Sequence, residues 1–123
     1  MWTQPACEAL TSGRVLELRY DGYLRSVEVH AVGYTEERNA VMRVWQMGGG
    51  SVSNEPVGWK LLRLDEASGA YVTNTVSAAP RIGYRRDDRA MARIICQLWT
   101  TAIALATGQG RLVIYCAVRI VVH

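Results

Sequence analysis

Hydrophobic and polar residues alternate over much of the chain up to residue 76, which is the pattern of strands with one buried face. In the segment VLELRY (residues 15–20), the leucines and the tyrosine fall on one face, and Glu17 and Arg19 fall on the other. An Asp-Gly dipeptide follows, which favours the tight turn between two antiparallel strands. Residues 23–34 alternate again, so the sequence predicts a β-hairpin here.

Three more strands are expected between short turns rich in glycine, serine and asparagine. They cover residues 40–47, 58–64 and 70–76. A short amphipathic helix is expected over residues 5–11, because a proline opens this segment and its alanines and leucine recur at helical spacing. Five short strands with tight connections indicate a small curled antiparallel sheet or an SH3- or Sm-like barrel.

The hydrophobic period changes in the last third of the chain and predicts one longer helix. Apolar residues recur at three- and four-residue spacing over residues 91–105, after an N-cap at Asp87 or Asp88. Gly108 ends this helix, and residues 111–122 are an almost unbroken apolar run, typical of a strand that is buried on both faces or covered by a partner chain. The expected fold class is therefore α+β, mainly β, with a short N-terminal helix, a longer C-terminal helix and a final apolar strand.

A chain of 123 residues has the size of one domain and is too short for two ordinary ones. Half of the residues are hydrophobic, which supplies a core without disulfides or a structural metal. We therefore expect a single domain over residues 1–123. The apolar stretch from Ile94 to Val122 is divided by residues 108–111 into pieces shorter than the ~20 residues of a membrane-spanning helix, so no membrane insertion is expected.

The cysteines and histidines do not form the pattern of a metal site. Cys7, Cys96 and Cys116 are odd in number and widely spaced, and only His30 and His123 are present to join them. Zinc sites need four ligands in clustered pairs, so neither a metal nor another cofactor is expected. Three unpaired thiols fit a reducing compartment, and the first residues lack the pattern of a signal peptide, so a cytoplasmic location is expected.

The charge balance is mildly basic and depends almost entirely on arginine. Lysine and arginine exceed aspartate and glutamate by 14 to 11, and Lys60 is the only lysine. Arginine makes planar, bidentate contacts with phosphates and carboxylates, which favours an anionic partner. The alternative is a coding sequence rich in arginine codons, and composition alone leaves both interpretations open.

Five segments, spread over about residues 5–97, share features with one known family. They are ALTSGRVLELRYDG, LRSVEVHAVGY, VMRVWQ, GWKLLRLDE and PRIGYRRDD. With these segments the chain resembles a WYL domain, a bacterial module similar to an Sm or SH3-like barrel that follows a short helix. The resemblance implies a sensor of nucleotides or single-stranded nucleic acid in the control of transcription or phage defence, and it implies no catalytic reaction.

Some positions match the family pattern and others depart from it. The matching positions are Tyr20, residues 25–30, Trp45 and residues 59–65. Val29 stands where the family often has proline, Leu62 where it has an aromatic residue, and Glu66 where it commonly has arginine. The helix-turn-helix domain that usually precedes the family module is not expected in this chain, and residues 98–123 are interpreted as an addition, the helix end and a strand for assembly.

Glu28 and His30 lie two residues apart in a predicted strand and so project from the same face, where the carboxylate can orient the imidazole toward a ligand. The alternative is a pair that braces the rim of the barrel. Arginines and aromatic residues interleave on the strands, which suits phosphate pairing and base stacking, or else a core of aromatics with solvated arginines. The candidate ligand-binding residues are Tyr20, Arg25, Glu28, His30, Arg43 and Arg63.

The sequence thus predicts a non-enzymatic binding module for an anionic, nucleotide-like small molecule or a short single-stranded nucleic acid. The alternative is a protein-interaction module that forms a homodimer through the strand over residues 112–122. A hydrolase that uses a cysteine and His30 is a third possibility, for which no complete catalytic set is visible. Trp59 is interpreted as a core residue, and Arg85 and Arg86 as the solvated start of the longer helix.

Overall fold

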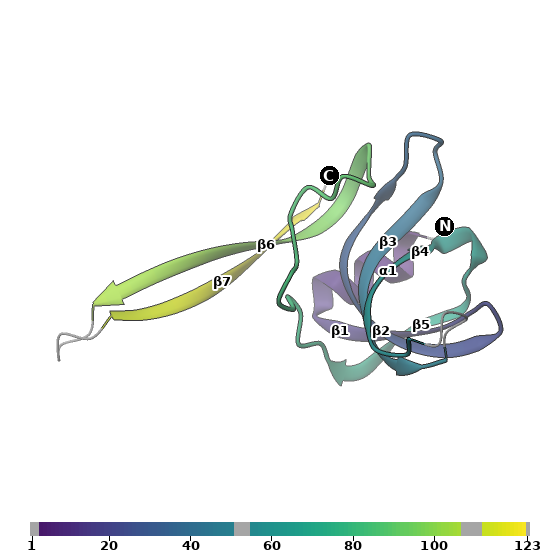
Figure 1. The fold of residues 1–123 in the computed structure, drawn as a ribbon, viewed down its shortest axis with the longest axis horizontal. Coiled ribbons are helices and arrows are strands. Elements are labelled where there is room, and N and C mark those ends of the chain that lie inside the picture. Colours follow the sequence, from purple (N-terminus) through teal and green to yellow (C-terminus); the bar gives the residue numbers. More distant parts are fainter. Residues whose placement is uncertain (1–2, 51–54, 107–111, 123) are drawn as a thin grey trace.

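The computed structural model describes residues 3–50, 55–106 and 112–122, with side chains described up to residue 98. Helix α1 and seven strands form the chain over these residues (Figure 1). In chain order they are α1 (Thr3–Ser12), β1 (Arg14–Tyr20), β2 (Tyr23–Tyr34), β3 (Ala40–Gly49), β4 (Gly58–Arg63), β5 (Ser68–Val76), β6 (Arg93–Ala106) and β7 (Leu112–Val122), with a 3-10 turn, η1 (Leu64–Glu66), between β4 and β5.

The strands form one antiparallel sheet organised around β2. The strand order is β4-β3-β2-β1-β5, and β6 adds to β2 and β7 to β6. The first part of β2 pairs with β1, from Tyr23 to Val27, and its last part pairs with β6, from Ala31 to Tyr34. Strand β3 follows β2 along both parts with two register shifts, which bend the pair. The predicted mainly β fold is confirmed as an open, curled antiparallel sheet (Figure 1).

The core lies between the curled sheet and α1. The helix buries Ala6, Ala9 and Leu10 against apolar side chains of β1, β2 and β3, among them Leu16 and Met42. The three helix residues are spaced as one face of a helix requires, which is why the sequence reveals it. The helix ends where Gly13 adopts a positive φ of 67° and donates its N–H to the carbonyl of Leu10.

The predicted C-terminal helix is wrong, because residues 93–106 form strand β6. Its apolar residues are so closely spaced that they fit a strand as well as a helix, and pairing with β2 decides for the strand. Alternate residues Cys96 and Leu98 are buried in the main core. The predicted final strand is confirmed as β7. Among the residues described, no helix is both long enough and apolar enough to cross a membrane.

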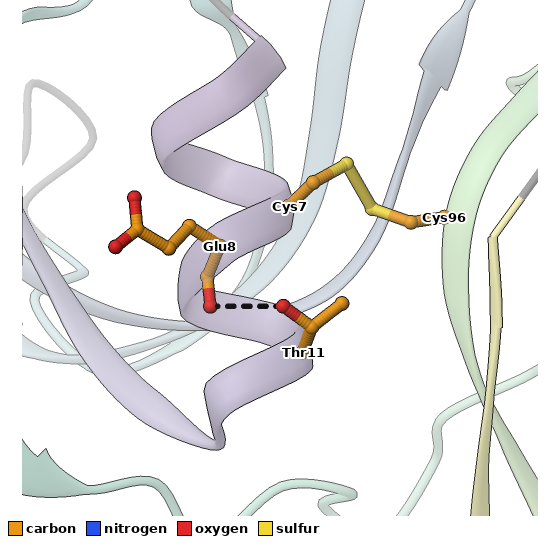
Figure 2. Close-up of a disulfide and its surroundings, with 4 residues drawn as sticks. All are labelled: Cys7, Glu8, Thr11 and Cys96. Atoms are coloured by element: carbon orange, nitrogen blue, oxygen red, sulfur yellow. Dashed lines mark hydrogen bonds between the residues drawn. A yellow bond between two sulfur atoms is a disulfide. The ribbon is translucent and has the colours of Figure 1, made fainter.

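The predicted absence of disulfides is also wrong, because Cys7 of α1 and Cys96 of β6 form one (Figure 2). Their Cα atoms lie 6.2 Å apart, although the residues are separated by 89 positions in the sequence. The spacing of cysteines does not reveal this bond, since the packing of α1 beside β6 brings the two residues together. Beside the bond, Thr11 donates its hydroxyl to the carbonyl of Glu8, as Figure 2 shows.

Strands β6 and β7 form a long hairpin that extends away from the rest of the sheet (Figure 1). In the described residues β7 pairs with β6 alone, which leaves its other edge open. An open edge on an apolar strand favours pairing with another chain. The homodimer through residues 112–122 stays a prediction, which light scattering of the chain with and without residues 111–123 tests: a monomer in both cases would contradict it.

Candidate functional site

The connection between β5 and β6, residues 77–92, crosses one face of the sheet, and we call it the strap. The register places Glu28 of β2 opposite Trp45 of β3, and Trp45 opposite Trp59 of β4, so these three side chains share a face. It is the face opposite the one that α1 covers, because Val29 and Val44, the neighbours of these residues, point into the core. The strap therefore lies over polar and aromatic side chains.

Two buried side chains of β2 hold the start of the strap. The Glu28 carboxylate accepts a hydrogen bond from the Arg81 Nε at 2.6 Å and another from the backbone N–H of Ala78. The His30 Nε2 accepts the backbone N–H of Arg81 at 2.9 Å, and the Nδ1 lies 2.9 Å from the carbonyl of Glu28. Glu28 and His30 are completely buried, so both side chains bind the strap from the side that faces the sheet.

These contacts define the state of the His30 ring. Because Nε2 accepts a hydrogen bond, it carries no proton, and the proton of the neutral ring resides on Nδ1, which donates to the Glu28 carbonyl. Burial lowers the pKa of His30 from 6.5 to about 4, although the Glu28 carbonyl and carboxylate oppose this shift. The carbonyl of Glu28, and not its carboxylate, thus orients the imidazole, so the pair matches the bracing role named as the alternative.

We expect stability to fall between pH 6.5 and pH 4 because of His30. Above pH 6.5 His30 is neutral in both the folded and the unfolded state, and its contribution to the free energy of unfolding is fully present. On acidification the unfolded chain binds a proton near pH 6.5, whereas folded His30 binds one only near pH 4, so stability falls between these values. The loss is about 3 kcal/mol at pH 4. Urea unfolding of wild type and His30→Gln at pH 7 and pH 4.5 measures it. The same pH dependence in both proteins would contradict this role.

Strands β3 and β6 hold the end of the strap. The Arg43 guanidinium makes two hydrogen bonds to the Asp88 carboxylate, at 2.6 and 3.3 Å. Burial raises the pKa of Asp88, but the bonds from Arg43 and from the Ala90 N–H outweigh it, so the pKa lies below its usual range. Gln97 accepts the backbone N–H of Asp87 at 2.9 Å and donates to its carboxylate at 3.0 Å. The strap is therefore anchored at both ends.

Between these anchors the strap contributes to an aromatic cluster. Trp59 lies edge-on to His30 at 4.7 Å between ring centroids and edge-on to Trp45 at 5.4 Å. Tyr84 of the strap lies 6.5 Å from Trp59 with an interplanar angle of 30°. Its hydroxyl donates to the carbonyl of Leu98 at 2.6 Å, and burial raises the pKa of that hydroxyl. Tyr84 is thus fixed beside Trp59.

A cavity of about 580 Å³ lies between the strap and strands β3 and β4. It combines four arginines, two aspartates and two aromatic rings, and its volume is in the usual range for small-molecule sites. The lining residues are Arg43, Trp59, Gly83, Tyr84, Arg85, Arg86, Asp87, Asp88 and Arg89. Basic groups and aromatic rings in one cavity suit a ligand with a negative charge and a flat ring.

Of the six candidate residues from the sequence, Arg43 alone lines this cavity. Glu28 and His30 lie beneath the strap, as described above. The other three lie elsewhere. Arg25 is buried against the Tyr20 ring, 5.0 Å from its centroid, and donates to Gln46 at 3.3 Å. The Arg63 guanidinium pairs with Asp65 at 2.5 Å, while its backbone N–H donates to the Tyr20 hydroxyl.

Most of the cavity residues were not among the candidates. The sequence pattern favours a core position for Trp59 and a solvated helix start for Arg85 and Arg86, but all three line the cavity. The signal that could have found them is the density of cations and aromatics in the segment RIGYRRDDR (residues 81–89). A segment with so many charges between glycine and aspartate fits a surface loop better than a helix.

Neither a metal site nor a relative points to the function of this cavity. Within the described ranges, no three His, Cys, Asp or Glu side chains lie close enough together to hold a metal ion. Comparison with protein-family models, curated proteins and solved structures found no match. The cavity is therefore the main observation on which a function can rest.

Proposed function

We propose that this protein is a non-enzymatic sensing module that binds a nucleotide-like anion in the cavity between the strap and the sheet. The observation that carries the proposal is the arrangement of exposed arginines of the strap around the rings of Trp59 and Tyr84. In this proposal a base stacks on the aromatic rings and a phosphate pairs with the guanidinium groups. A short single-stranded nucleic acid also presents a base and a phosphate, so it is the larger ligand that the proposal includes.

The buried polar residues support a binding role over a catalytic one. Glu28 and His30 are the obvious acid–base pair, but the carboxylate is bonded to Arg81 and Ala78, and both ring nitrogens of His30 are bonded to backbone groups. Neither side chain faces the cavity with a free atom. Their role in the proposal is to hold the strap in the shape that the ligand needs.

The resemblance to WYL domains supports the same function, and with it we propose that the curled sheet is a variant of the Sm or SH3-like barrel. The cavity uses strap arginines in place of Arg25 and Arg63, so the site differs from the one the resemblance implies. A cytoplasmic location is also part of the proposal. The disulfide between Cys7 and Cys96 is unusual in a reducing compartment, so the redox state of these thiols in cells tests that location.

Replacing Trp59 by leucine tests the proposed function. We expect wild type to bind adenosine monophosphate in isothermal titration calorimetry, and Trp59→Leu to bind it about 5- to 150-fold more weakly, because stacking of one base contributes about 1–3 kcal/mol. Trp45→Leu is the matched control, since Trp45 belongs to the aromatic cluster but does not line the cavity. Thermal unfolding of both variants verifies that they are folded.

Two results would contradict the proposal. One is a folded Trp59→Leu variant that binds the nucleotide as tightly as wild type does. The other is a wild-type protein that binds no nucleotide and no short single-stranded oligonucleotide at millimolar concentration.

A further inference from the structure

The cavity is lined by more positive than negative side chains, four arginines and two aspartates. Arg43 is neutralised by Asp88, at 2.6 Å, and Arg86 lies 3.5 Å from Asp87. These two pairs use both aspartates of the cavity. The other two cavity arginines, Arg85 and Arg89, make no hydrogen bond or ion pair with the part of the chain that the structure describes. Among the described residues, two positive charges of the cavity therefore have no compensating partner.

Both uncompensated arginines follow residues that are fixed in place. Arg85 follows Tyr84, whose hydroxyl is bonded to the carbonyl of Leu98. Arg89 follows Asp88, whose carboxylate is held by Arg43 and also accepts the N–H of Ala90. The backbone under each arginine is thus held before a ligand arrives, while the side chains themselves are exposed. Such positions lower the cost of ordering a ligand between them.

From this balance we infer that the cavity selects a ligand whose phosphate carries two negative charges, that is, a terminal phosphomonoester. The inference rests on the proposed function and narrows its ligand class. A phosphomonoester loses its second proton near pH 6 and is close to a dianion at neutral pH, so it compensates both arginines. A cyclic phosphodiester or an internal phosphate of a nucleic acid carries one charge and leaves one arginine uncompensated.

Arg85 and Arg89 have different neighbours, so the inference assigns each a different contact with a bound nucleotide. Arg85 follows Tyr84, whose ring stacks on Trp59, so the inference assigns Arg85 to the end of the phosphate nearer the base and sugar. Arg89 follows Asp88, the partner of Arg43, in the same lining. A phosphate oxygen bonded to each guanidinium would place the phosphate between these two arginines, with the base on the aromatic rings.

Three adenine compounds with the same base test the inference: adenosine, 3′,5′-cyclic adenosine monophosphate and adenosine 5′-monophosphate. By isothermal titration calorimetry at pH 7.5 we expect the monophosphate to bind about ten-fold more tightly than the cyclic compound, because one more charged pair forms. Adenosine should bind most weakly. Between pH 7.5 and pH 5.5 the advantage of the monophosphate should decrease, since its phosphate takes up the second proton.

Variants of the two arginines show whether they are the source of this preference. Arg85→Gln and Arg89→Gln should each bind the monophosphate about ten-fold more weakly and lose most of its advantage over the cyclic compound. Arg63→Gln is the control, because it removes the same type of charge from a position outside the cavity lining. Because its guanidinium pairs with Asp65 and not with a cavity residue, this control should keep both the affinity and the preference of wild type.

The outcomes separate the inference from the proposed function. Equal affinity for the monophosphate and the cyclic compound, or a preference that survives in both glutamine variants, would overturn the inference while leaving nucleotide binding intact. Affinity that grows with oligonucleotide length and ignores a terminal phosphate would also overturn it. Binding of none of these compounds would overturn the proposed function itself.

Discussion

Loss of the disulfide between Cys7 and Cys96 is expected to lower the free energy of unfolding by about 3–5 kcal/mol. The bond joins residues 89 positions apart, so it restricts most of the unfolded chain, and stabilisation by a crosslink increases with the length of the closed loop. Urea unfolding of oxidised wild type, reduced wild type and Cys7→Ala measures the effect. Reduced wild type and Cys7→Ala should agree closely.

The third cysteine supplies the control for this experiment. Cys116 lies in β7 and takes no part in the bond, so Cys116→Ala should leave the difference between oxidised and reduced protein unchanged. If reduction did not change the unfolding midpoint of wild type, the bond would not contribute to stability. The bond also lies directly before Gln97 and Leu98, which hold the strap, so β6 connects the crosslink to the cavity.

Replacing Glu28 by alanine is the second change with a large expected effect, about 2–3 kcal/mol of unfolding free energy. The carboxylate is completely buried and holds both Arg81 and the backbone of Ala78. Its removal leaves the partly buried Arg81 guanidinium and the Ala78 N–H without their partner, which costs more than the loss of an exposed pair. The strap would also lose its first anchor, so nucleotide affinity should fall together with stability.

A second ion pair of nearly the same length, but exposed to solvent, separates the effect of burial on stability from the effect of the pairing itself. The N–O distance is 2.6 Å between Arg81 and Glu28 and 2.5 Å between Arg63 and Asp65, but the second pair is exposed to solvent. Asp65→Asn is therefore expected to leave the unfolding midpoint in urea almost unchanged. Similar losses of stability in Glu28→Ala and Asp65→Asn would show that burial does not set the value of these pairs.

The candidate site was predicted from strand positions, and the structure explains why this was only partly successful. The sequence correctly marks Glu28 and His30 as a pair, because a carboxylate and an imidazole two residues apart share one face of the predicted strand. Their partners, however, are Ala78 and Arg81, about fifty positions away. No local sequence pattern predicts that the strap covers Glu28 and His30. Glu28 and His30, which the sequence assigns to ligand binding, instead form hydrogen bonds with the strap.

The error over β6 has a different physical cause. In the segment RIICQLW (residues 93–99), apolar residues satisfy both the helical and the strand period, so periodicity cannot choose between them. The choice depends on the free edge of β2, where Tyr34 pairs with Arg93 and Ala31 with Gln97. Backbone groups of β2 that would otherwise lack partners are bonded when this segment is extended.

The sequence by itself determined the elements whose signals are local. The alternation in residues 15–20, the Asp-Gly turn and the spacing of alanines in α1 are sufficient for the first hairpin and the helix, because each depends on residues a few positions apart. The tertiary structure alone decided the disulfide, the strand β6 and the cavity. Each of these depends on groups distant in the chain that meet only when the sheet curls and the strap closes over it.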